Sequence, residues 1–176
     1  MAVAIIRERE APMEKIKKIL APADLSPSSK EGVRYALEIA RSQGAEVIVY
    51  NVITPEETPF PQAIEAWVAK QVDLPQVRKT IEERKGSLAE FMRENFADYL
   101  AAIKVREDVE IGTPYKRIVE KAAQEGADMI IMCTHGRTGL LHMLIGSVTE
   151  QVVRRAPCAV LSVPPPKPTA PTDEAE

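Results

Sequence analysis

The sequence predicts an α/β domain with an open, doubly wound, five-stranded parallel sheet and helices on both faces, which is a Rossmann-like architecture. Two observations predict this fold. Short apolar runs alternate with longer segments whose apolar residues recur at helical spacing, as in strand–helix–strand units. The run 46–53 is also almost continuously apolar, as expected of a strand that helices cover on both faces. The length of 176 residues suits one domain.

Five short segments rich in apolar residues are the predicted strands. The third of them is predicted from its alternating pattern and from its isoleucine and valine content, because it is not continuously apolar. The five segments span residues 16–21, 46–53, 103–111, 128–133 and 158–163.

Helix start and stop signals separate these strands. Ser26 is a favourable N-cap, and Pro27 fits the first helical position because that residue needs no hydrogen-bonded N–H. Gly44 ends the same helix, since glycine readily takes the left-handed conformation that follows a helix. The remaining helices are expected over 63–100 with a break at Pro75, from Pro114 to Gly126 and from near Val148.

The chain divides into three parts. We expect an N-terminal extension over residues 1–13 and the folded domain over 14–163. Residues 164–176 contain five prolines and almost nothing apolar to bury, so we expect a proline-rich disordered tail.

The composition argues against several classes of protein. With 23 basic and 26 acidic side chains the formal charge is −3, so the chain does not have the bulk positive charge of a nucleic-acid-binding protein. No segment approaches the roughly 18 apolar residues of a spanning helix, so we expect no membrane association. Residues 1–10 lack the basic start and apolar core of a secretory signal, which predicts a cytoplasmic protein.

The residues that most often carry metal or acid–base chemistry are few. Cys133 ends the fourth predicted strand and Cys158 begins the fifth, so the two should lie at opposite ends of the sheet and form no disulfide. The chain has no Cys-x-x-Cys or His-Glu-x-x-His motif, and we expect no metal site. His135 has no recognisable nucleophile or orienting carboxylate, so we expect no catalytic residues.

One glycine-rich segment, residues 133–149, suggests a ligand. It leaves a strand and leads into a helix, and it contains three glycines. Glycine lets backbone N–H groups approach an anion closely, and a helix start adds unpaired donors, so the segment fits a phosphate group. The alternative is structural, because Ser147 with Glu150 fits a capping box and glycines often only punctuate loops.

The same segment resembles the C-terminal signature of the universal stress protein family. Gly136, nine further residues and then Gly146-Ser147 match the second half of that signature, while Cys133 stands in place of its first glycine. The segments 20–26 and 50–53 are also similar to the family. The resemblance covers residues 14–163 and implies the family's fold, which is similar to that of the adenine nucleotide α-hydrolases.

The resemblance to ATP-binding members implies ATP as the ligand, alone or with Mg²⁺. Asp24 and Val52 would hold the adenosine, and Met132 and Cys133 would border the sugar. The alternative for Asp24 is a turn residue whose side chain accepts backbone hydrogen bonds. The residues implied around the phosphates are Gly136, Arg137, Gly146, Ser147, Val148 and Thr149.

The function that the resemblance implies is a nucleotide-binding regulatory homodimer in the stress response, which signals through an unidentified protein partner. Members often pair through the last strand, here 158–163. The sequence agrees with this, because an apolar edge strand should not stay exposed. If ATP is turned over at all, we expect slow hydrolysis.

The alternative is a stress-associated interaction module on the same fold that binds no nucleotide. The cysteine at position 133 supports it, since a side chain there could crowd the sugar. Phe60, Ile64 and Trp67 would offer a surface for a partner.

Overall fold

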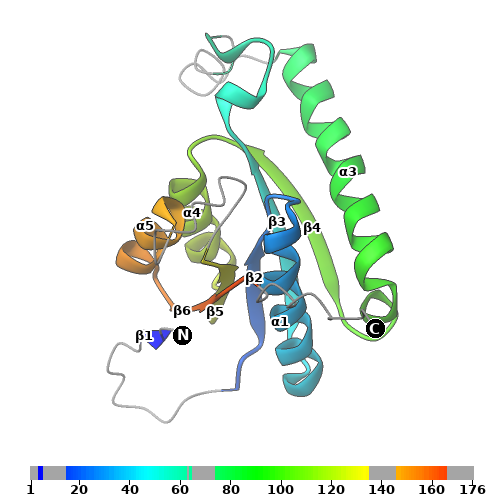
Figure 1. Ribbon diagram of the computed structural model, residues 1–176, viewed down its shortest axis with the longest axis vertical. Coiled ribbons are helices and arrows are strands. Elements are labelled where there is room, and N and C mark those ends of the chain that lie inside the picture. Colours follow the sequence, from blue (N-terminus) through cyan, green and yellow to red (C-terminus); the bar gives the residue numbers. More distant parts are fainter. Residues whose placement is uncertain (1–3, 6–14, 63, 65–73, 135–145, 166–176) are drawn as a thin grey trace, which may run out of the picture.

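The computed structural model describes residues 4–5, 15–62, 64, 74–134 and 146–165, and Figure 1 shows their arrangement. One six-stranded sheet runs through them in the order β1-β6-β5-β2-β3-β4. The parallel strands are β2 (Lys18–Pro22), β3 (Glu46–Ile53), β4 (Val105–Ile111), β5 (Met129–Cys133) and β6 (Ala159–Val163). They confirm the five predicted strands, with starts shifted by at most two residues.

The helices form a layer on each face of this sheet. Helices α1 (Pro27–Gln43) and α3 (Pro75–Leu100) pack on one face, and α4 (Pro114–Glu125) and α5 (Ser147–Arg155) pack on the other (Figure 1). Successive residues of a central strand enter different cores, so that Ile19 faces the α1 side and Leu20 the α4 side. Because both faces are buried, β3 needs apolar side chains in both directions, which explains its continuous apolar run.

The helix ends follow the predicted signals. The Ser26 hydroxyl accepts a hydrogen bond from the Ser29 N–H, and Gly44 follows α1 with φ of 65°. Helix α3 begins at Pro75, which confirms the predicted break, while residues 63 and 65–73 lie outside the described part of the chain. Gly126 follows α4 with φ of 62°.

A short strand that the sequence analysis does not predict lies at the edge of the sheet. Strand β1 (Ala4–Ile5) belongs to the expected extension 1–13 and pairs antiparallel with β6, Ala4 opposite Leu161 and Ile5 opposite Val160. The edge that we expected to be open for a partner is therefore paired within the chain. Two residues are too few to show a strand periodicity, which is why no pattern indicated β1.

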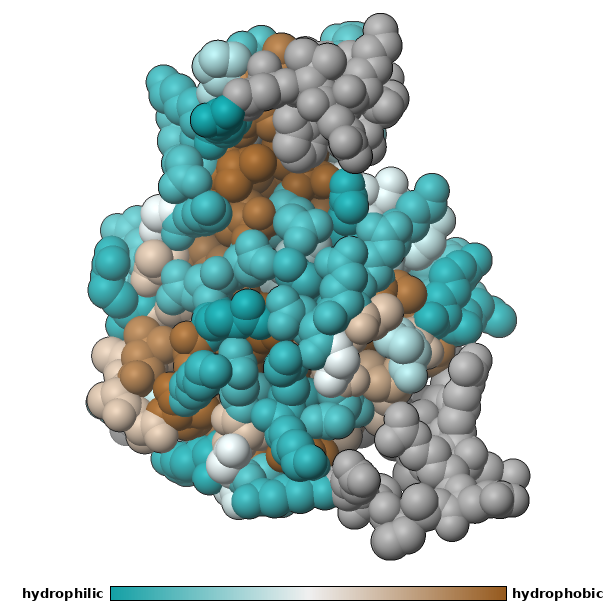
Figure 2. All heavy atoms as spheres, turned by 180° about the vertical axis from the view of Figure 1, so that it is seen from behind, coloured by the Kyte–Doolittle hydropathy of each residue, from teal (hydrophilic) through white to brown (hydrophobic). Residues whose placement is uncertain are grey.

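Two further predictions concern the cysteines and the partner surface. The predicted surface of Phe60, Ile64 and Trp67 is wrong for Ile64, which is fully buried in the core that Phe60 packs against, and Trp67 lies outside the described residues. Cys133 pairs with Val163 at one end of β6, whereas Cys158 precedes the other end, which confirms that the thiols lie far apart along the strands. Among the described side chains only Tyr35 is a large apolar residue with substantial exposure, at 45%. Hydrophilic residues accordingly dominate the face seen in Figure 2.

No helix in the described ranges is long and apolar enough to cross a membrane.

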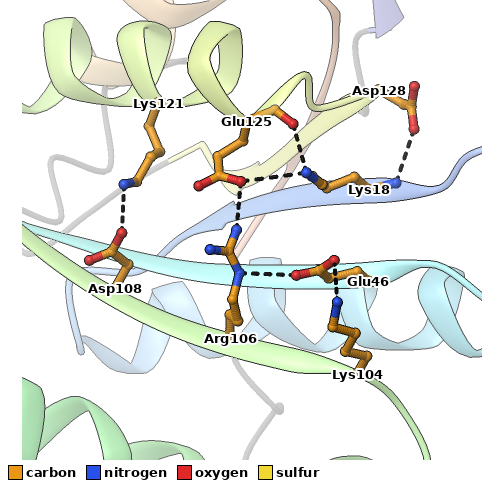
Figure 3. Close-up of polar contacts among 8 residues, drawn as sticks. All are labelled: Lys18, Glu46, Lys104, Arg106, Asp108, Lys121, Glu125 and Asp128. Atoms are coloured by element: carbon orange, nitrogen blue, oxygen red, sulfur yellow. Dashed lines mark hydrogen bonds and ion pairs between the residues drawn. The ribbon is translucent and has the colours of Figure 1, made fainter.

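Charged side chains link the strands at their amino ends (Figure 3). Arg106 on β4 donates to Glu46 on β3 over 3.0 Å and to Glu125 at the end of α4 over 2.6 Å. Lys18 on β2 reaches the same Glu125 carboxylate at 3.4 Å, and the Asp128 carboxylate accepts the Lys18 N–H at 3.0 Å. This network ties β2, β3 and β4 together at the edge of the sheet where those strands begin.

The network predicts a loss of stability in acid. The Arg106 guanidinium lowers the pKa of Glu125 below its ordinary 4.5. Burial alone would raise the pKa of Glu46, but Lys104 and Arg106 outweigh it and lower that pKa as well. A carboxylate with a lowered folded-state pKa stabilises the fold above its unfolded pKa, and this contribution disappears as the pH falls through the folded value.

We therefore expect Arg106→Met to destabilise the protein by about 1 kcal/mol at pH 7, since the arginine is partly exposed. The difference from wild type should begin to narrow near pH 4.5, the ordinary glutamate pKa, and should disappear as the pH falls through the lower folded-state pKa values of the two glutamates. Thermal unfolding between pH 7 and pH 3 measures this, with Lys79→Met in an exposed pair as the control. A difference that stays constant over the whole range would contradict the expected role of these carboxylates.

Candidate functional site: a cavity at the carboxyl ends of the strands

A cavity of about 310 Å³ opens where the parallel strands end. Its walls come from the ends of β2, β3 and β5 and from the first turns of α1, α4 and α5. In doubly wound sheets this edge is where ligands bind, because the strand order reverses there and leaves a crevice. The volume falls at the lower end of the range of small-molecule sites.

Most of the predicted site residues meet at this cavity. Those that line it are Asp24, Val52, Met132, Cys133, Gly146, Ser147, Val148 and Thr149. Gly136 and Arg137 lie outside the described residues. The structure thus brings together three segments that lie between Asp24 and Thr149 and are far apart in the sequence.

The loop between β2 and α1 is fixed by its own polar groups. Asp24 Oδ1 accepts hydrogen bonds from the Ser26 N–H at 3.0 Å and from the Ser26 hydroxyl at 2.5 Å. Leu25 between them takes φ of 63°, an uncommon conformation for a branched side chain. Asp24 therefore has the turn role named as its alternative, and it also lines the cavity.

A second wall contains residues that the sequence analysis does not single out. Asn51, which is 1% exposed, donates from Nδ2 to the Ala23 carbonyl at 2.7 Å and so joins β3 to the β2–α1 loop. Arg84 on α3 donates to Asn51 Oδ1 and to Glu57, each over 3.3 Å. Asn51 and Glu57 both line the cavity. A polar residue inside an otherwise buried strand was the available signal for Asn51, whereas nothing in the sequence links Glu57 with Arg84.

The start of α5 is attached to the end of β5. The Thr149 hydroxyl donates to the Cys133 carbonyl at 3.0 Å, and the Gly146 N–H donates to the Thr134 carbonyl at 2.7 Å. Gly146 is the N-cap, so the structural alternative in which Ser147 caps the helix is wrong. The Thr149 hydroxyl is thus used within the protein, although Thr149 is among the residues that the resemblance implies around the phosphates.

The first turn of α5 supplies the donors that suit an anion. Its first bond to a carbonyl four residues back runs from the Glu150 N–H to the Gly146 carbonyl at 3.0 Å. The N–H groups of Ser147, Val148 and Thr149 precede this bond and have no intrahelical acceptor. Together with the positive end of the helix dipole, they face the side of the cavity that these residues line.

The opposite wall has a different electrostatic character. The charged groups among the described lining residues are two carboxylates, Asp24 and Glu57, and these residues include no lysine or arginine. Burial and the Glu110 carboxylate raise the pKa of the Tyr50 phenol far above its ordinary value, so Tyr50 is neutral. The cavity therefore combines hydrogen-bond acceptors on one wall with helix N–H donors on another, an arrangement that suits a ligand with both a donor-rich part and an anionic part.

The described residues form a doubly wound α/β domain with a cavity at the carboxyl edge of its sheet, the edge where such folds bind small molecules. The sequence matches the Universal stress protein family over residues 15–164. The chain belongs to that family.

Two curated relatives show the extent of the match. The chain is 31% identical over 151 residues to universal stress protein MJ0531 of Methanocaldococcus jannaschii, which covers 86% of this chain and 84% of the relative. It is 33% identical over 150 residues to universal stress protein A homolog 1 of Coxiella burnetii, covering 84% and 95%. Sequence similarity therefore extends over nearly the whole of these relatives.

Solved structures agree with this assignment. The structure of protein MJ0577 of M. jannaschii superposes with a TM-score of 0.69 at 29% identity, over 87% of this chain and 99% of that one. UspA from Lactobacillus plantarum gives a TM-score of 0.67 at 20% identity, over 88% and 100%, and supports the fold alone.

Proposed function

We propose that the protein is a cytoplasmic regulatory protein of the stress response that binds ATP in the cavity at the carboxyl edge and acts as a homodimer. The observation that carries the proposal is the meeting of Asp24 and Val52 with the first turn of α5 around one cavity. Some members of the family bind ATP, and these are the positions that the resemblance assigns to the nucleotide. Signalling would pass to a protein partner.

The two walls suggest how the nucleotide lies. The carboxylates of Asp24 and Glu57 can accept hydrogen bonds from sugar hydroxyls or a base amino group, but they would repel phosphates. The N–H groups of Ser147, Val148 and Thr149 can donate to phosphate oxygens. Adenosine would therefore occupy the β2–β3 side and the phosphates the α5 side, with Mg²⁺ offsetting part of the phosphate charge.

Calorimetric titration with ATP, with and without Mg²⁺, tests the proposal. We expect saturable binding in the micromolar range, about −8 kcal/mol. Gly146→Val should weaken binding at least roughly tenfold, or by about 1.4 kcal/mol, because Gly146 lines the cavity and a branched side chain there would reduce the room for the phosphates. Gly146 has φ of −66° and ψ of 151°, which valine also adopts, so the variant should fold.

Gly86→Val on α3 is the matched control, since a side chain there meets nothing within 4 Å. It should bind ATP as the wild type does. An absence of heat and of thermal stabilisation up to millimolar ATP would contradict the proposal. The interaction module without nucleotide, which the cysteine among the cavity-lining residues favours, would then replace it.

We also propose that the homodimer forms through the edge strand 158–163. Strand β6 lies at one end of the row of parallel strands, next to β1, and Val160 and Val163 contribute to the two cores. A second copy that takes the place of β1 would satisfy the outer backbone hydrogen bonds of β6 along more of its length.

A further inference from the structure

The outer edge of β6 already has an occupant in the single chain. Strand β1 pairs antiparallel with Val160 and Leu161, which lie in the middle of β6 (Ala159–Val163). Figure 1 shows β1 beside β6 at the end of the sheet. The family match begins at residue 15, so the strand that covers this edge comes from outside the part of the chain that the family shares.

A second copy of the chain would need the same backbone groups. When a two-fold axis relates two identical edge strands, they pair antiparallel, and each strand presents the same residues to the other. Strand β1 is also antiparallel to β6 and occupies its centre. An edge strand can form only one such ladder on its open side, so β1 and a partner's β6 exclude each other there.

We propose that β1 is a tethered competitor for the dimerisation edge, so that the chain exchanges between a closed form, in which β1 covers β6, and an open form that pairs with a second copy. This inference rests on the homodimer of the proposed function. It adds that residues preceding the shared domain set the concentration at which the dimer forms.

The two strands that compete for β6 differ in length and in tethering, so the protein concentration can shift the balance between the closed and open forms. Strand β1 offers only two residues, whereas the β6 of a second copy offers five. Strand β1, however, is joined to β2 through residues 6–17, and a short linker gives an intramolecular contact an effective concentration of roughly millimolar. The closed form should therefore dominate in dilute solution, and the longer strand of the second copy should prevail as the protein concentration rises.

Sedimentation equilibrium tests this with four proteins: the full chain, a chain lacking residues 1–10, the full chain with Ile5→Pro, and a chain lacking residues 167–176. Proline removes a strand N–H and disfavours pairing, but it leaves the length of the chain unchanged. Truncation at residue 167 is the control, because it removes a segment of similar length beyond the family match. We expect the truncation of 1–10 and Ile5→Pro to lower the protein concentration at the midpoint of dimerisation roughly tenfold or more. The control should leave this concentration unchanged.

Equal midpoints in all four proteins, or a higher midpoint without β1, would overturn the inference and leave the homodimer intact. If no variant dimerises up to ~0.2 mM, the homodimer of the proposed function is wrong. The proposed competition between β1 and a second copy is then wrong as well. Hydrogen exchange on dilute, monomeric samples gives an independent reading. The summed exchange of the Val160 and Leu161 backbone amides should be faster in the chain without β1 than in the full chain. Unchanged exchange at both amides would show that β1 does not cover the edge.

Discussion

Gly32→Ala should lower the free energy of unfolding by about 1–2 kcal/mol, even though alanine is the better helix former. Gly32 lies on α1 where the helix crosses β5. A Cβ atom at this position would lie 2.9 Å from the Cys133 nitrogen and 3.2 Å from the Met132 carbonyl carbon. Both atoms are backbone, so no side chain can rotate away, and α1 and the end of β5 must move apart. Cys133 at that end of β5 lines the cavity, so ATP binding should weaken as well.

Gly86→Ala is the matched control for this prediction. Gly86 lies within α3, and a Cβ atom there meets nothing within 4 Å. Alanine should then raise the free energy of unfolding by about 0.5–1 kcal/mol through helix propensity alone. Urea unfolding followed by circular dichroism measures both variants. If both substitutions stabilise the protein, the close approach of α1 to β5 is not tight enough to limit the side chain at position 32.

Lys121→Met should have the larger effect on stability, with a loss of about 2–3 kcal/mol. The Lys121 side chain is only 10% exposed and places its ammonium group 2.5 Å from Asp108 and 2.8 Å from Glu110 on β4 (Figure 3 shows the Asp108 pair). It also lies over the Tyr50 ring at 5.4 Å from the centroid. Without the lysine, two carboxylates on one face of β4 would remain partly buried with no cation from this position.

The control and the rescue for Lys121→Met separate charge from packing. Lys85→Met removes a cation from an exposed pair with Glu82, and it should change the free energy of unfolding by less than about 0.5 kcal/mol. Adding Asp108→Asn to Lys121→Met should restore part of the loss, since only one carboxylate then remains. Chemical unfolding at pH 7 gives all three values. An equal loss in the single and double variants would mean that methionine packs poorly and that charge is not the cause.

The parts of the fold that the sequence predicted are those with local causes. Helix α1 has a serine cap and a terminal glycine within its own segment, and both signals act on adjacent backbone groups. Strand β3 is recognisable because burial on both faces requires apolar side chains throughout. Clustering of Asp24 with Ser147 could be predicted because the carboxyl ends of parallel strands meet at one edge.

The features that the sequence did not predict depend on distant contacts. Arg84 fixes Glu57 across 27 positions of sequence, and a charged residue within a helical pattern gives no indication of such a partner. Pairing of Ala4–Ile5 with β6 joins the N-terminal extension to the last strand through two residues, too short a run to carry a pattern. Thr149 was placed near the phosphates by its position in the signature, and nothing in the sequence indicated that its hydroxyl donates to the Cys133 carbonyl.

The most direct test of the proposed nucleotide site is a titration of ¹⁵N-labelled protein with ATP, followed through the backbone amide resonances. We expect saturable shifts that include Ser147, Val148 and Thr149, because their N–H groups would donate to the phosphates. The amides of Lys18 and Arg106 at the opposite edge of the sheet should stay unchanged, since the charged network there lies at the far end of the strands. Saturable shifts confined to that far edge, or none up to millimolar ATP, would contradict binding of ATP in the cavity.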